Sequence, residues 1–543
     1  MVISMKRIAV IGAGCSGLVA MKSCLDQGLE PICFEREKDI GGLWNYSEEV
    51  KLSKGSVYNS CTINTCKEMM SFSDFPPPVE FPPFMPHRCV LKYFKMYAAN
   101  FDLYRHIRFQ TSVEQIQQSI DYQTTGRWDV RVRSEVDGSV LTETFDGVMV
   151  CTGHHSYPHI PDFPGMDKFK GKVIHSHSYR KNDEFKDKNI LIVGIGNSAV
   201  DIAIDTSHVA SQVCLSTRRG AWVVSRRGPW GLPADAIANS RFMFKLPKSM
   251  LQWSVEKISN YVFDHESYGL KPAHRALEAH PTISDDLPTS IMTGKVRVKP
   301  NVLEFDENGV KFEDGSYEEI DAVIFATGYD YKISFVDESV TGLKNNQPNL
   351  FKYVFPPHLP HATFAVIGLV QAIGALLPIS EMQCRWYTSI FSNKTKLPTE
   401  DEMLSDIEEK RDEMRSYYHS QRHTIQAFWI EYMDEIASMI GVKPNLIQLF
   451  KEDPSLAVKC FFGPCVPSQY RLVGPGKWNG AKPTIVSAMD RLMNPMKTRI
   501  LPKNRQISHN KSRQIMISGP AFLRSYFIVI YLFIVLILCM CMA

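Results

Sequence analysis

Two glycine-rich loops in this 543-residue chain have the residue types that hold the pyrophosphate of a dinucleotide. In such a loop the first glycine permits a tight turn and the second lets the backbone approach the phosphates. The third lets the following helix pack closely on the strand. The first loop comprises Gly12, Ala13, Gly14, Cys15, Ser16 and Gly17. Its chemistry would be the binding of a redox coenzyme by backbone amides at a helix N-terminus.

An acidic residue indicates which coenzyme the first loop prefers. Glu35 follows the apolar run 31–34, the next predicted strand after Gly17. A carboxylate there can accept hydrogen bonds from a ribose 2′-OH, whereas it would repel a 2′-phosphate. The first loop therefore predicts FAD or NAD and not NADP.

The second glycine loop is followed by cations. Arg218 and Arg219 come shortly after the next predicted strand, at nearly the same topological place that Glu35 has after the first loop. Guanidinium groups there can bind a 2′-phosphate with two parallel hydrogen bonds, so we expect this loop to prefer NADPH. The alternative is that both arginines belong to a solvated turn. The candidate residues of this loop are Gly194, Gly196, Asn197, Ser198, Ala199, Val200 and Asp201, where an alanine replaces the third glycine.

Two nucleotide sites on one chain narrow the possible reactions. NADPH would pass a hydride to a flavin, and the reduced flavin would then deliver its electrons to a disulfide, an electron carrier or oxygen. We expect no metal site.

Each loop stands between a predicted strand and a predicted helix, as a dinucleotide-binding loop requires. Strands are predicted at 7–11 and 31–34 around the first loop and at 189–193 and 212–216 around the second, with a helix at 18–25. The fold class is therefore α/β, with two Rossmann-like dinucleotide-binding domains.

The order of the motifs predicts that one domain is inserted into the other. The strands 147–153 and 321–329 both contain an apolar run followed by Thr-Gly, and we interpret them as the exit from the FAD domain and the return to it. The expected parts are an FAD domain built from 1–155 and 331–445, an NADPH domain at 156–330 and an extension at 446–522. The two chain crossings would form a hinge beside a cleft.

Residues 222–295 add material that a bare NADPH domain does not need. Leu251, Val255, Ile258 and Val262 share one helical stripe. We favour a helix packed on the body of the protein through this stripe. A membrane contact by residues 240–263 is the alternative, because basic residues flank them.

Composition excludes some classes of partner. The 61 Lys and Arg balance 58 Asp and Glu for a net charge of +3, which argues against nucleic acid. The 13 cysteines show no disulfide framework and favour a reducing, cytosol-facing compartment.

The C-terminal end predicts a membrane anchor. Residues 526–543 carry no charge and would extend about 27 Å as a helix at ~1.5 Å per residue, close to the thickness of a bilayer core. Basic residues between 497 and 524 precede this run and favour a cytosolic body. We therefore expect a transmembrane tail anchor at 523–543; a buried core helix is the alternative.

One segment between the loops makes the similarity to a known family specific. Phe169-Lys-Gly171-Lys-Val-Ile-His175-Ser-His-Ser-Tyr179 resembles the signature of class B flavoprotein monooxygenases, and its ending in tyrosine resembles the animal microsomal flavin-containing monooxygenases (dimethylaniline monooxygenase type). Further segments resemble the same family: Gly41-Gly-Leu-Trp44, 64–75, 280–282, 325–329 and 367–371. They span most of residues 5–445.

The resemblance implies an NADPH- and O2-dependent enzyme that uses FAD to oxygenate soft nucleophiles, small molecules containing nitrogen or sulfur, through a C4a-hydroperoxyflavin. It implies an endoplasmic reticulum membrane protein of xenobiotic metabolism with its catalytic body in the cytosol, and it leaves a homo-oligomer open. Asn64 matches the family's active-site asparagine; the alternative is a loop residue that caps a turn. By the same resemblance Leu43, Trp44, Thr65, Gly328 and Gln371 bind cofactor, as do Ser198 and Asp201, although Asp201 could instead complement the helix dipole.

Other interpretations stay open. Cys61 and Cys66 have the C-x4-C spacing of FAD- and NADPH-dependent disulfide reductases, although no glycine run adjoins them. Baeyer–Villiger oxygenation of ketones uses the same cofactors, and a non-catalytic flavoprotein that senses nucleotides is a third alternative. His175 is either a general base or, as we favour, a hydrogen-bonding residue of the linker between domains.

Overall fold

The structure is a computed structural model that describes residues 5–51, 54–418 and 424–499. The chain divides into two compact units, Met1–Leu492 and Met493–Ala543, and all elements below except the last turn, η7 (Asn494–Met496), lie in or begin in the first. The predicted anchor at 523–543 lies outside the described residues. Among the helices of the described ranges, none is long and apolar enough to cross a membrane.

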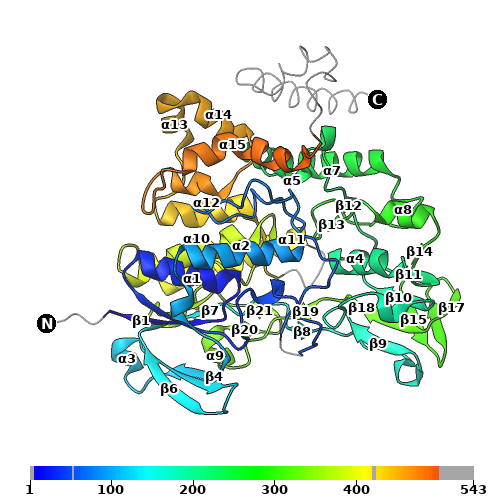
Figure 1. Ribbon diagram of the computed structural model, residues 1–543, viewed down its shortest axis with the longest axis horizontal. Helices are drawn as coiled ribbons and strands as arrows, with labels where there is room; N and C mark the ends of the chain where they lie inside the picture. The colour runs from blue at the N-terminus through cyan, green and yellow to red at the C-terminus, as the bar shows by residue number, and fades with distance from the viewer. Residues whose placement is uncertain (1–4, 52–53, 419–423, 500–543) are drawn as a thin grey trace. The chain divides into compact units, whose positions relative to one another are not determined.

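The first sheet is parallel and holds the first glycine loop (Figure 1). Its strand order is β22-β7-β1-β2-β3. The bounds are β1 Arg7–Ile11, β2 Glu30–Phe34, β3 Ile107–Arg108, β7 Gly147–Val150 and β22 Phe364–Val366. The predicted strands at 7–11 and 31–34 are confirmed. Strand β22 pairs with β7 but follows every strand of the second sheet in the chain, so the first sheet is completed by residues from beyond the second.

Helix α1 (Cys15–Asp26) is enclosed on all sides, because every residue from Ser16 to Cys24 is buried. Leu18, Val19 and Met21 are fully buried. Its other neighbour is α10 (Leu376–Phe391), almost all of whose residues are buried. This layer fixes the direction of α1, so its N-terminus meets the carboxyl ends of the strands, where ligands bind in such folds.

The second sheet is also parallel and has the order β14-β11-β10-β18-β9. It takes all its strands from residues 172–325: β9 Lys172–His175, β10 Asn189–Val193, β11 Gln212–Ser216, β14 Val296–Lys299 and β18 Ala322–Phe325. Helices α4 (Asn197–Thr206) and α8 (Leu287–Met292) cover it. The predicted strands at 189–193 and 212–216 are confirmed. Figure 1 shows the second sheet on the right and the first on the left.

The chain passes between the two sheets twice, at neighbouring positions. Strand β8 (Tyr157–Pro158) leads toward the second sheet and β19 (Tyr329–Asp330) leads back. The two strands are antiparallel partners, with Tyr329 opposite Pro158. The two crossings therefore form one two-stranded connection.

Smaller elements surround the sheets. One antiparallel sheet contains β4 Thr111–Gln118, β5 Trp128–Ser134 and β6 Val140–Phe145. Another contains β15 Val302–Phe305, β16 Gly309–Phe312 and β17 Tyr317–Glu319. Short turns, helices and a hairpin are η1 Gly42–Trp44, α2 His87–Asn100, η2 Tyr104–His106, α3 Tyr122–Thr125, η3 Met166–Lys168, η4 Asp183–Phe185, α9 Glu338–Thr341, β20 Leu343–Lys344 and β21 Gln347–Pro348.

The segment 222–295 includes a pair of short strands and four helical elements before α8. These are β12 Val223–Val224, η5 Pro229–Gly231, α5 Ala234–Ala238, α6 Arg241–Phe244, α7 Lys248–Val262 and β13 Thr282–Ile283. The predicted helix is α7. The expectation that its apolar stripe packs on the body is wrong for the second half, where Ile258 is 41% and Val262 63% exposed. The buried face of α7 is polar and includes Gln252, which donates to Glu278.

The elements that follow β22 in the chain complete the first unit. Besides α10, they are β23 Gln371–Ile373, α11 Glu400–Tyr417, β24 Gln426–Phe428, α12 Trp429–Met439, α13 Leu446–Glu452, α14 Pro454–Phe462, η6 Pro467–Arg471 and α15 Ala481–Met493. Figure 1 shows α12, α13 and α14 above the first sheet. Arg471 anchors them through buried ion pairs to Glu381 (2.7 Å) and Asp74 (2.9 Å). Residues far beyond the second sheet thus help to hold the first one.

Candidate functional site

The first glycine loop turns as tightly as its pattern predicts. Gly12 has φ +98°, and its amide donates to Phe34 O at 2.9 Å. A Cβ on Gly17 would stand 1.8 Å from Gly12 O, so no larger residue fits there. A Cβ on Gly14 would lie 3.7 Å from Cα of Gly42. The backbone of η1, with Leu43 and Trp44, is therefore brought beside the loop.

The N-terminus of α1 is open to an anion. Its N-cap residue is Gly14, and among the described residues no side chain caps it and no acidic residue occupies the first turn. The free amides and the positive end of the helix dipole therefore face the loop. Ser16 is fixed behind it by a bond from its hydroxyl to Ser380 Oγ (3.1 Å), and Cys15 is half-buried nearby.

Glu35 is buried against the first loop. Its Oε2 accepts from Ala13 N at 2.7 Å and its Oε1 from Glu37 N at 2.9 Å. Burial raises the pKa of Glu35, while these two backbone donors lower it. Each oxygen keeps a second lone pair, so the carboxylate can also accept from a ribose hydroxyl.

The second loop repeats the geometry. Gly194 has φ +128°, its amide donates to Ser216 O at 2.9 Å, and a Cβ there would meet Ala326 O at 2.5 Å. A Cβ on Gly196 would meet no described atom within 4 Å. Gly196 is also the N-cap residue of α4, which carries no side-chain cap and no acidic first-turn residue among the described residues. This loop therefore presents open space and backbone amides together.

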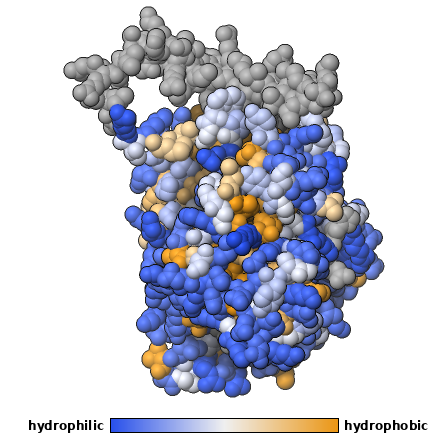
Figure 2. Space-filling model, turned by 90° about the vertical axis from the view of Figure 1, so that its right-hand side faces the viewer, coloured by the Kyte–Doolittle hydropathy of each residue, from blue (hydrophilic) through white to orange (hydrophobic). Residues whose placement is uncertain are grey.

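A cavity of about 550 Å³ lies at the second loop. It contains exposed Arg218 and Arg219 at the end of β11, as well as His155 and Tyr329 from the chain crossings. Figure 2 shows the face on which the second sheet lies, where apolar side chains gather in a hollow amid hydrophilic ones. Of the predicted cofactor residues, this cavity brings together Gly194, Gly196, Arg218, Arg219, Gly328 and Gln371.

The other predicted residues of the second loop are not among those that line the cavity. Asn197 accepts through Oδ1 from Ile283 N at 2.7 Å and so ties α4 to β13. Ala199 and Val200 are fully buried, whereas Ser198 is exposed. Asp201 accepts from the hydroxyl of Tyr58 at 2.5 Å, and it lies beyond the first turn of α4, which is not the position of a residue that complements a dipole.

Asn64 is held by a residue that sequence reasoning missed. Its Oδ1 accepts from Nη2 of Arg226 at 2.6 Å, and Arg226 also lies 3.8 Å from the carboxylate of Asp285. Both charged residues belong to the segment 222–295, each just past one strand of the β12–β13 pair. Because this bond occupies Oδ1, it fixes the direction in which the amide nitrogen of Asn64 can donate. Thr65, the next residue, is half-buried.

Asp235 supports the same loop from behind. Its Oδ2 accepts from Cys66 N at 2.6 Å, two residues past Asn64. Burial raises the pKa of Asp235 to about 6. The buried Oδ1 makes no hydrogen bond to the described residues. The segment 222–295 thus fixes the Asn64 loop at two points.

The histidines around the connection between the sheets are kept neutral. Burial lowers the pKa of His155, His175 and His280 to about 4. His175 accepts through Nδ1 from His177 N at 3.1 Å. At neutral pH these rings therefore add no positive charge to the site.

The cysteine pair does not have the properties of a redox dithiol. Cys61 and Cys66 are both free thiols. Burial raises the pKa of Cys61 to about 12 and holds that of Cys66 well above its ordinary value. An attacking thiol must ionise near neutral pH, which this environment opposes.

These residues fit two dinucleotides. The first loop offers a glycine turn, free helix amides and a buried carboxylate, which suit FAD. The second offers the same turn with two exposed guanidinium groups, which suit the 2′-phosphate of NADPH. Gln371 and Gly328 lie at the cavity of the second loop, and Asn64 is bonded to Arg226 of the segment 222–295.

Comparison with known proteins identifies relatives along nearly the whole chain. A family model described as flavin-binding monooxygenase-like matches residues 5–538. Flavin-containing monooxygenase 5 of Mus musculus is 50% identical over 507 residues, which cover 92% of this chain and 95% of that protein. Dimethylaniline monooxygenase [N-oxide-forming] 2 of Macaca mulatta is 45% identical over 505 residues, which cover 91% and 94%.

Solved structures share the fold. The S-allyl-L-cysteine S-oxygenase of Allium sativum superposes with a TM-score of 0.63 at 23% identity, over 90% of this chain and 99% of that one. A cyclohexanone monooxygenase of Rhodococcus sp. Phi1 bound to NADP+ gives 0.59 at 17% identity, over 81% and 98%. The two Rossmann-like sheets are therefore arranged as in these enzymes.

Proposed function

Because this chain belongs to the flavin-binding monooxygenase-like family, we propose that it is an NADPH- and O2-dependent monooxygenase that adds one oxygen atom to soft nucleophiles. Its cofactors are FAD and NADPH. The substrates are small molecules with a nucleophilic nitrogen or sulfur atom, the chemistry that the names of its relatives describe: N-oxide formation and S-oxygenation. The observation that carries the proposal is the pair of glycine loops with opposite charge at equivalent positions, Glu35 and Arg218.

The first loop would hold FAD and the second NADPH. Gly12 makes the tight turn, Gly14 would let the pyrophosphate of FAD approach the backbone, and Gly17 lets α1 pack on the loop. Glu35 would accept a hydrogen bond from the ribose of FAD. At the second loop, Gly196 leaves room for the other pyrophosphate. Arg218 and Arg219 border the same cavity and would bind the 2′-phosphate. When bound there, FAD would supply the acceptor for the hydride and the activation of O2.

The side chains of this protein position the reactants and do not create the nucleophile. The substrate supplies its own lone pair, so no general base is needed for the transfer. Asn64 can donate a hydrogen bond without adding charge, and Arg226 fixes the direction of that donor. Burial keeps His155 neutral and the Cys66 thiol protonated, so neither side chain exchanges a proton readily near neutral pH. Exclusion of water there favours transfer of the oxygen over its loss as peroxide.

Product analysis tests this function. The purified full chain, supplied with NADPH and ¹⁸O2, should convert a thioether into its S-oxide with one labelled oxygen atom. A ketone assayed beside it distinguishes Baeyer–Villiger oxygenation: ester as the main product would assign that alternative. NADPH consumption that requires a disulfide and no O2 would refute monooxygenation.

We further propose the division into domains and the membrane anchor that the order of motifs in the sequence predicts. The FAD domain is 1–155 with 331–445, and the NADPH domain is 156–330; the paired strands β8 and β19 lie at both predicted boundaries and support it. The tail 523–543 anchors the protein to the endoplasmic reticulum membrane with the body in the cytosol, as the uncharged run and its basic flank suggest. Removal of residues 523–543 should then release an active enzyme from membranes. If all of the truncated protein stayed in the membrane fraction, the anchor would be refuted.

A further inference from the structure

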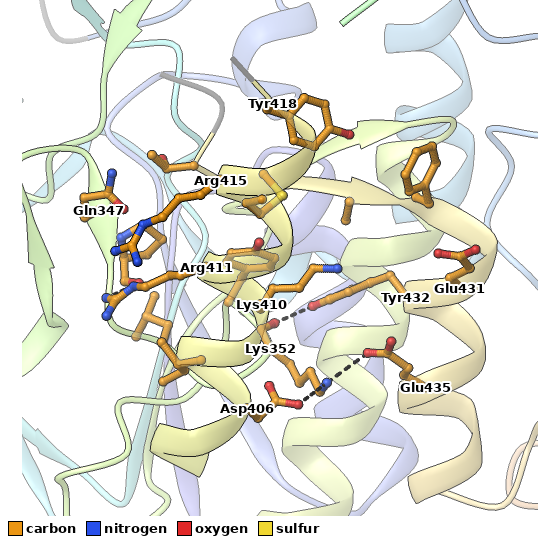
Figure 3. A pocket seen from close by; sticks show the side chains of 18 of the residues that line it. Gln347, Lys352, Asp406, Lys410, Arg411, Arg415, Tyr418, Glu431, Tyr432 and Glu435 are labelled. Atoms are coloured by element: carbon orange, nitrogen blue, oxygen red, sulfur yellow. Dashed lines mark hydrogen bonds and ion pairs between the residues drawn. The ribbon is translucent and has the colours of Figure 1, made fainter. Parts of the chain in front are cut away.

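A second cavity, of about 630 Å³, lies away from both glycine loops (Figure 3). Its walls are α11 and α12, and its floor is formed by residues around Lys352 and by β24. It shares no lining residue with the cavity at the second loop. Its volume falls within the range of about 300–1,000 Å³ that small-molecule sites occupy.

Apart from the ion pair of Lys352 and Asp406, the charges of this cavity are separated by sign. Lys410, Arg411 and Arg415 project from α11, whereas Glu431 and Glu435 project from α12 on the opposite side. In Figure 3 the two arginines lie at the left and the two glutamates at the right. A ligand that spans the cavity would therefore meet cations at one end and carboxylates at the other.

The arginines of α11 have local partners that a ligand can displace. Arg411 pairs with Glu408 and Arg415 with Asp412, each acid one turn earlier on the same helix. Nη2 of Arg411 also donates to Pro348 O at 3.3 Å and Asn349 Oδ1 at 3.4 Å, which aligns its guanidinium group at the cavity. Both acids are more than half exposed to water, and surface pairs of this kind are weak. An anionic group inside the cavity can therefore compete for the two guanidinium groups.

The floor of the cavity is rigid and charge-balanced. Lys352 is paired with Asp406 at 2.5 Å and with Glu435 at 3.0 Å. Burial lowers its pKa, but these two carboxylates outweigh burial and raise it. The hydroxyl of Tyr432 donates to Lys352 O at 2.5 Å. The ammonium group is thus neutralised by its neighbours, and the charges that meet a ligand are those of the two walls.

Two consecutive residues of the floor adopt an unfavourable backbone conformation. Lys352 has φ +50° and Tyr353 has φ +59°, the left-handed region that side chains other than glycine rarely occupy. Both side chains line the cavity. Such conformations persist where the surrounding structure enforces them, and they are concentrated at ligand-binding positions.

Aromatic and apolar side chains occupy the space between the charged walls. Tyr353, Tyr418 and Phe428 line the cavity together with Met414. Tyr353 and Tyr418 are each less than a tenth exposed. A ring or chain of a ligand can pack on these groups, and a cationic group can approach their faces.

We propose that this cavity binds a small zwitterion with an apolar body, of the amino-acid type. Its carboxylate would pair with Arg411 and Arg415, and its ammonium group with Glu431. The apolar body would pack on Tyr353 and Phe428. The site is independent of the proposed oxygenation, because its lining includes no residue assigned to FAD or NADPH.

Three probes with the same phenyl group test the need for both charges: L-phenylalanine, 3-phenylpropionate and 2-phenylethylamine. Their binding to the full-length FAD-loaded protein is measured by calorimetry in detergent, with NADP+ at saturation so that the nucleotide cavity is filled and no turnover occurs. We expect L-phenylalanine to bind at least tenfold more tightly than either singly charged analogue. Equal affinities of the three probes would overturn the proposal.

Variants assign the two ends of the ligand. Arg411→Gln should weaken L-phenylalanine at least tenfold and leave 2-phenylethylamine unchanged, and Glu431→Gln should weaken L-phenylalanine and leave 3-phenylpropionate unchanged. Arg105→Gln and Glu307→Gln serve as controls, since each removes one charge from an exposed ion pair elsewhere. Unchanged affinity for L-phenylalanine in both cavity variants would refute the assignment.

A photoreactive analogue locates the site directly. After irradiation with 4-azido-L-phenylalanine, peptides from 400–418 or 424–435 should carry the label, and excess L-phenylalanine should prevent it. Label found only on peptides of the glycine loops, or label that L-phenylalanine does not displace, would show that the cavity is not the binding site.

Discussion

Arg226 donates from Nη2 to Oδ1 of Asn64 across 2.6 Å, so a residue of the segment 222–295 fixes the side chain that we place at the flavin. The two residues are 162 positions apart in the chain. Asp285 lies behind Arg226 and compensates part of its charge. The amide of Asn64 is therefore oriented by a charged donor that is itself held in place.

Replacing Arg226 by Gln should uncouple NADPH oxidation from oxygenation. The lost bond involves a charged group, for which about 1.5–3 kcal/mol is typical, so S-oxide formation should fall about 10- to 100-fold. Arg227→Gln is the control, because Arg227 pairs with the same Asp285 (3.2 Å) but is mostly exposed. The readout is S-oxide and hydrogen peroxide formed per NADPH; equal coupling in both variants would contradict the positioning role.

Replacing Asn64 by Leu should preserve the fold and the bound flavin, because the side chain is only half-buried and its bond goes to Arg226, not to the first glycine loop. The variant should retain its yellow colour and oxidise NADPH, but should release hydrogen peroxide in place of oxygenated product. Flavin absorbance, peroxide assay and product analysis measure these quantities. Wild-type coupling in this variant would remove Asn64 from the mechanism.

Replacing Arg218 and Arg219 together by Ala should affect NADPH selectively. Charge-assisted bonds to the 2′-phosphate contribute about 1.5–3 kcal/mol, so kcat/KM for NADPH should fall about 10- to 100-fold, whereas the value for NADH should change little. Steady-state kinetics with both coenzymes provides the test. The same loss for both would mean that these residues do not contact the phosphate.

Two glycine substitutions should have opposite consequences. In Gly17→Ala the new Cβ would stand 1.8 Å from Gly12 O, so the variant should lose FAD and accumulate as unfolded protein. In Gly196→Ala the Cβ meets no described protein atom within 4 Å, so folding and FAD content should be normal. It should instead crowd the pyrophosphate and raise KM for NADPH. Normal NADPH kinetics in Gly196→Ala would place the coenzyme elsewhere.

Replacing Asp235 by Asn should stabilise the protein in a pH-dependent way. Burial raises the pKa of this carboxyl to about 6, whereas an unfolded chain has about 3.9, so ionisation of the folded form costs free energy. This cost is fully present above about pH 6 and disappears as the pH falls toward 4. We expect Asp235→Asn to raise the free energy of unfolding by about 3 kcal/mol at pH 7.5 and by less at pH 5.0. Denaturant titrations of the FAD-loaded protein measure the free energy of unfolding at both pH values. An equal gain in stability at pH 7.5 and pH 5.0 would exclude ionisation of Asp235 as the cause.

Local sequence patterns were sufficient to predict the strands and helix around the glycine loops. Each loop is adjacent in the chain to the strands and the helix that it joins, so periodicity and spacing predicted β1, α1, β10 and β11 correctly. The charge contrast between Glu35 and Arg218 was equally local. These features are properties of one βαβ unit and need no knowledge of the remaining chain.

The contacts between distant segments could not be predicted in this way. Nothing in the composition around Arg226 links it to Asn64, or Tyr58 to Asp201, because such pairs depend on how separate segments pack. The apolar stripe of α7 predicts that this stripe is the buried face. The buried face is instead polar, and Gln252 on it donates a hydrogen bond to Glu278. Hydrophobic periodicity shows which side is apolar, not which side has a neighbour.

The pairing of β8 with β19 has a consequence for protein engineering. The positions where the chain leaves for the second sheet and returns from it are paired neighbours, with Asp330 opposite Tyr157. The intervening segment therefore behaves as a cassette with adjacent ends. It could be exchanged between relatives at two junctions to transfer coenzyme preference, provided that the donor segment keeps Arg226 and Asp235, which contact the Asn64 loop of the recipient.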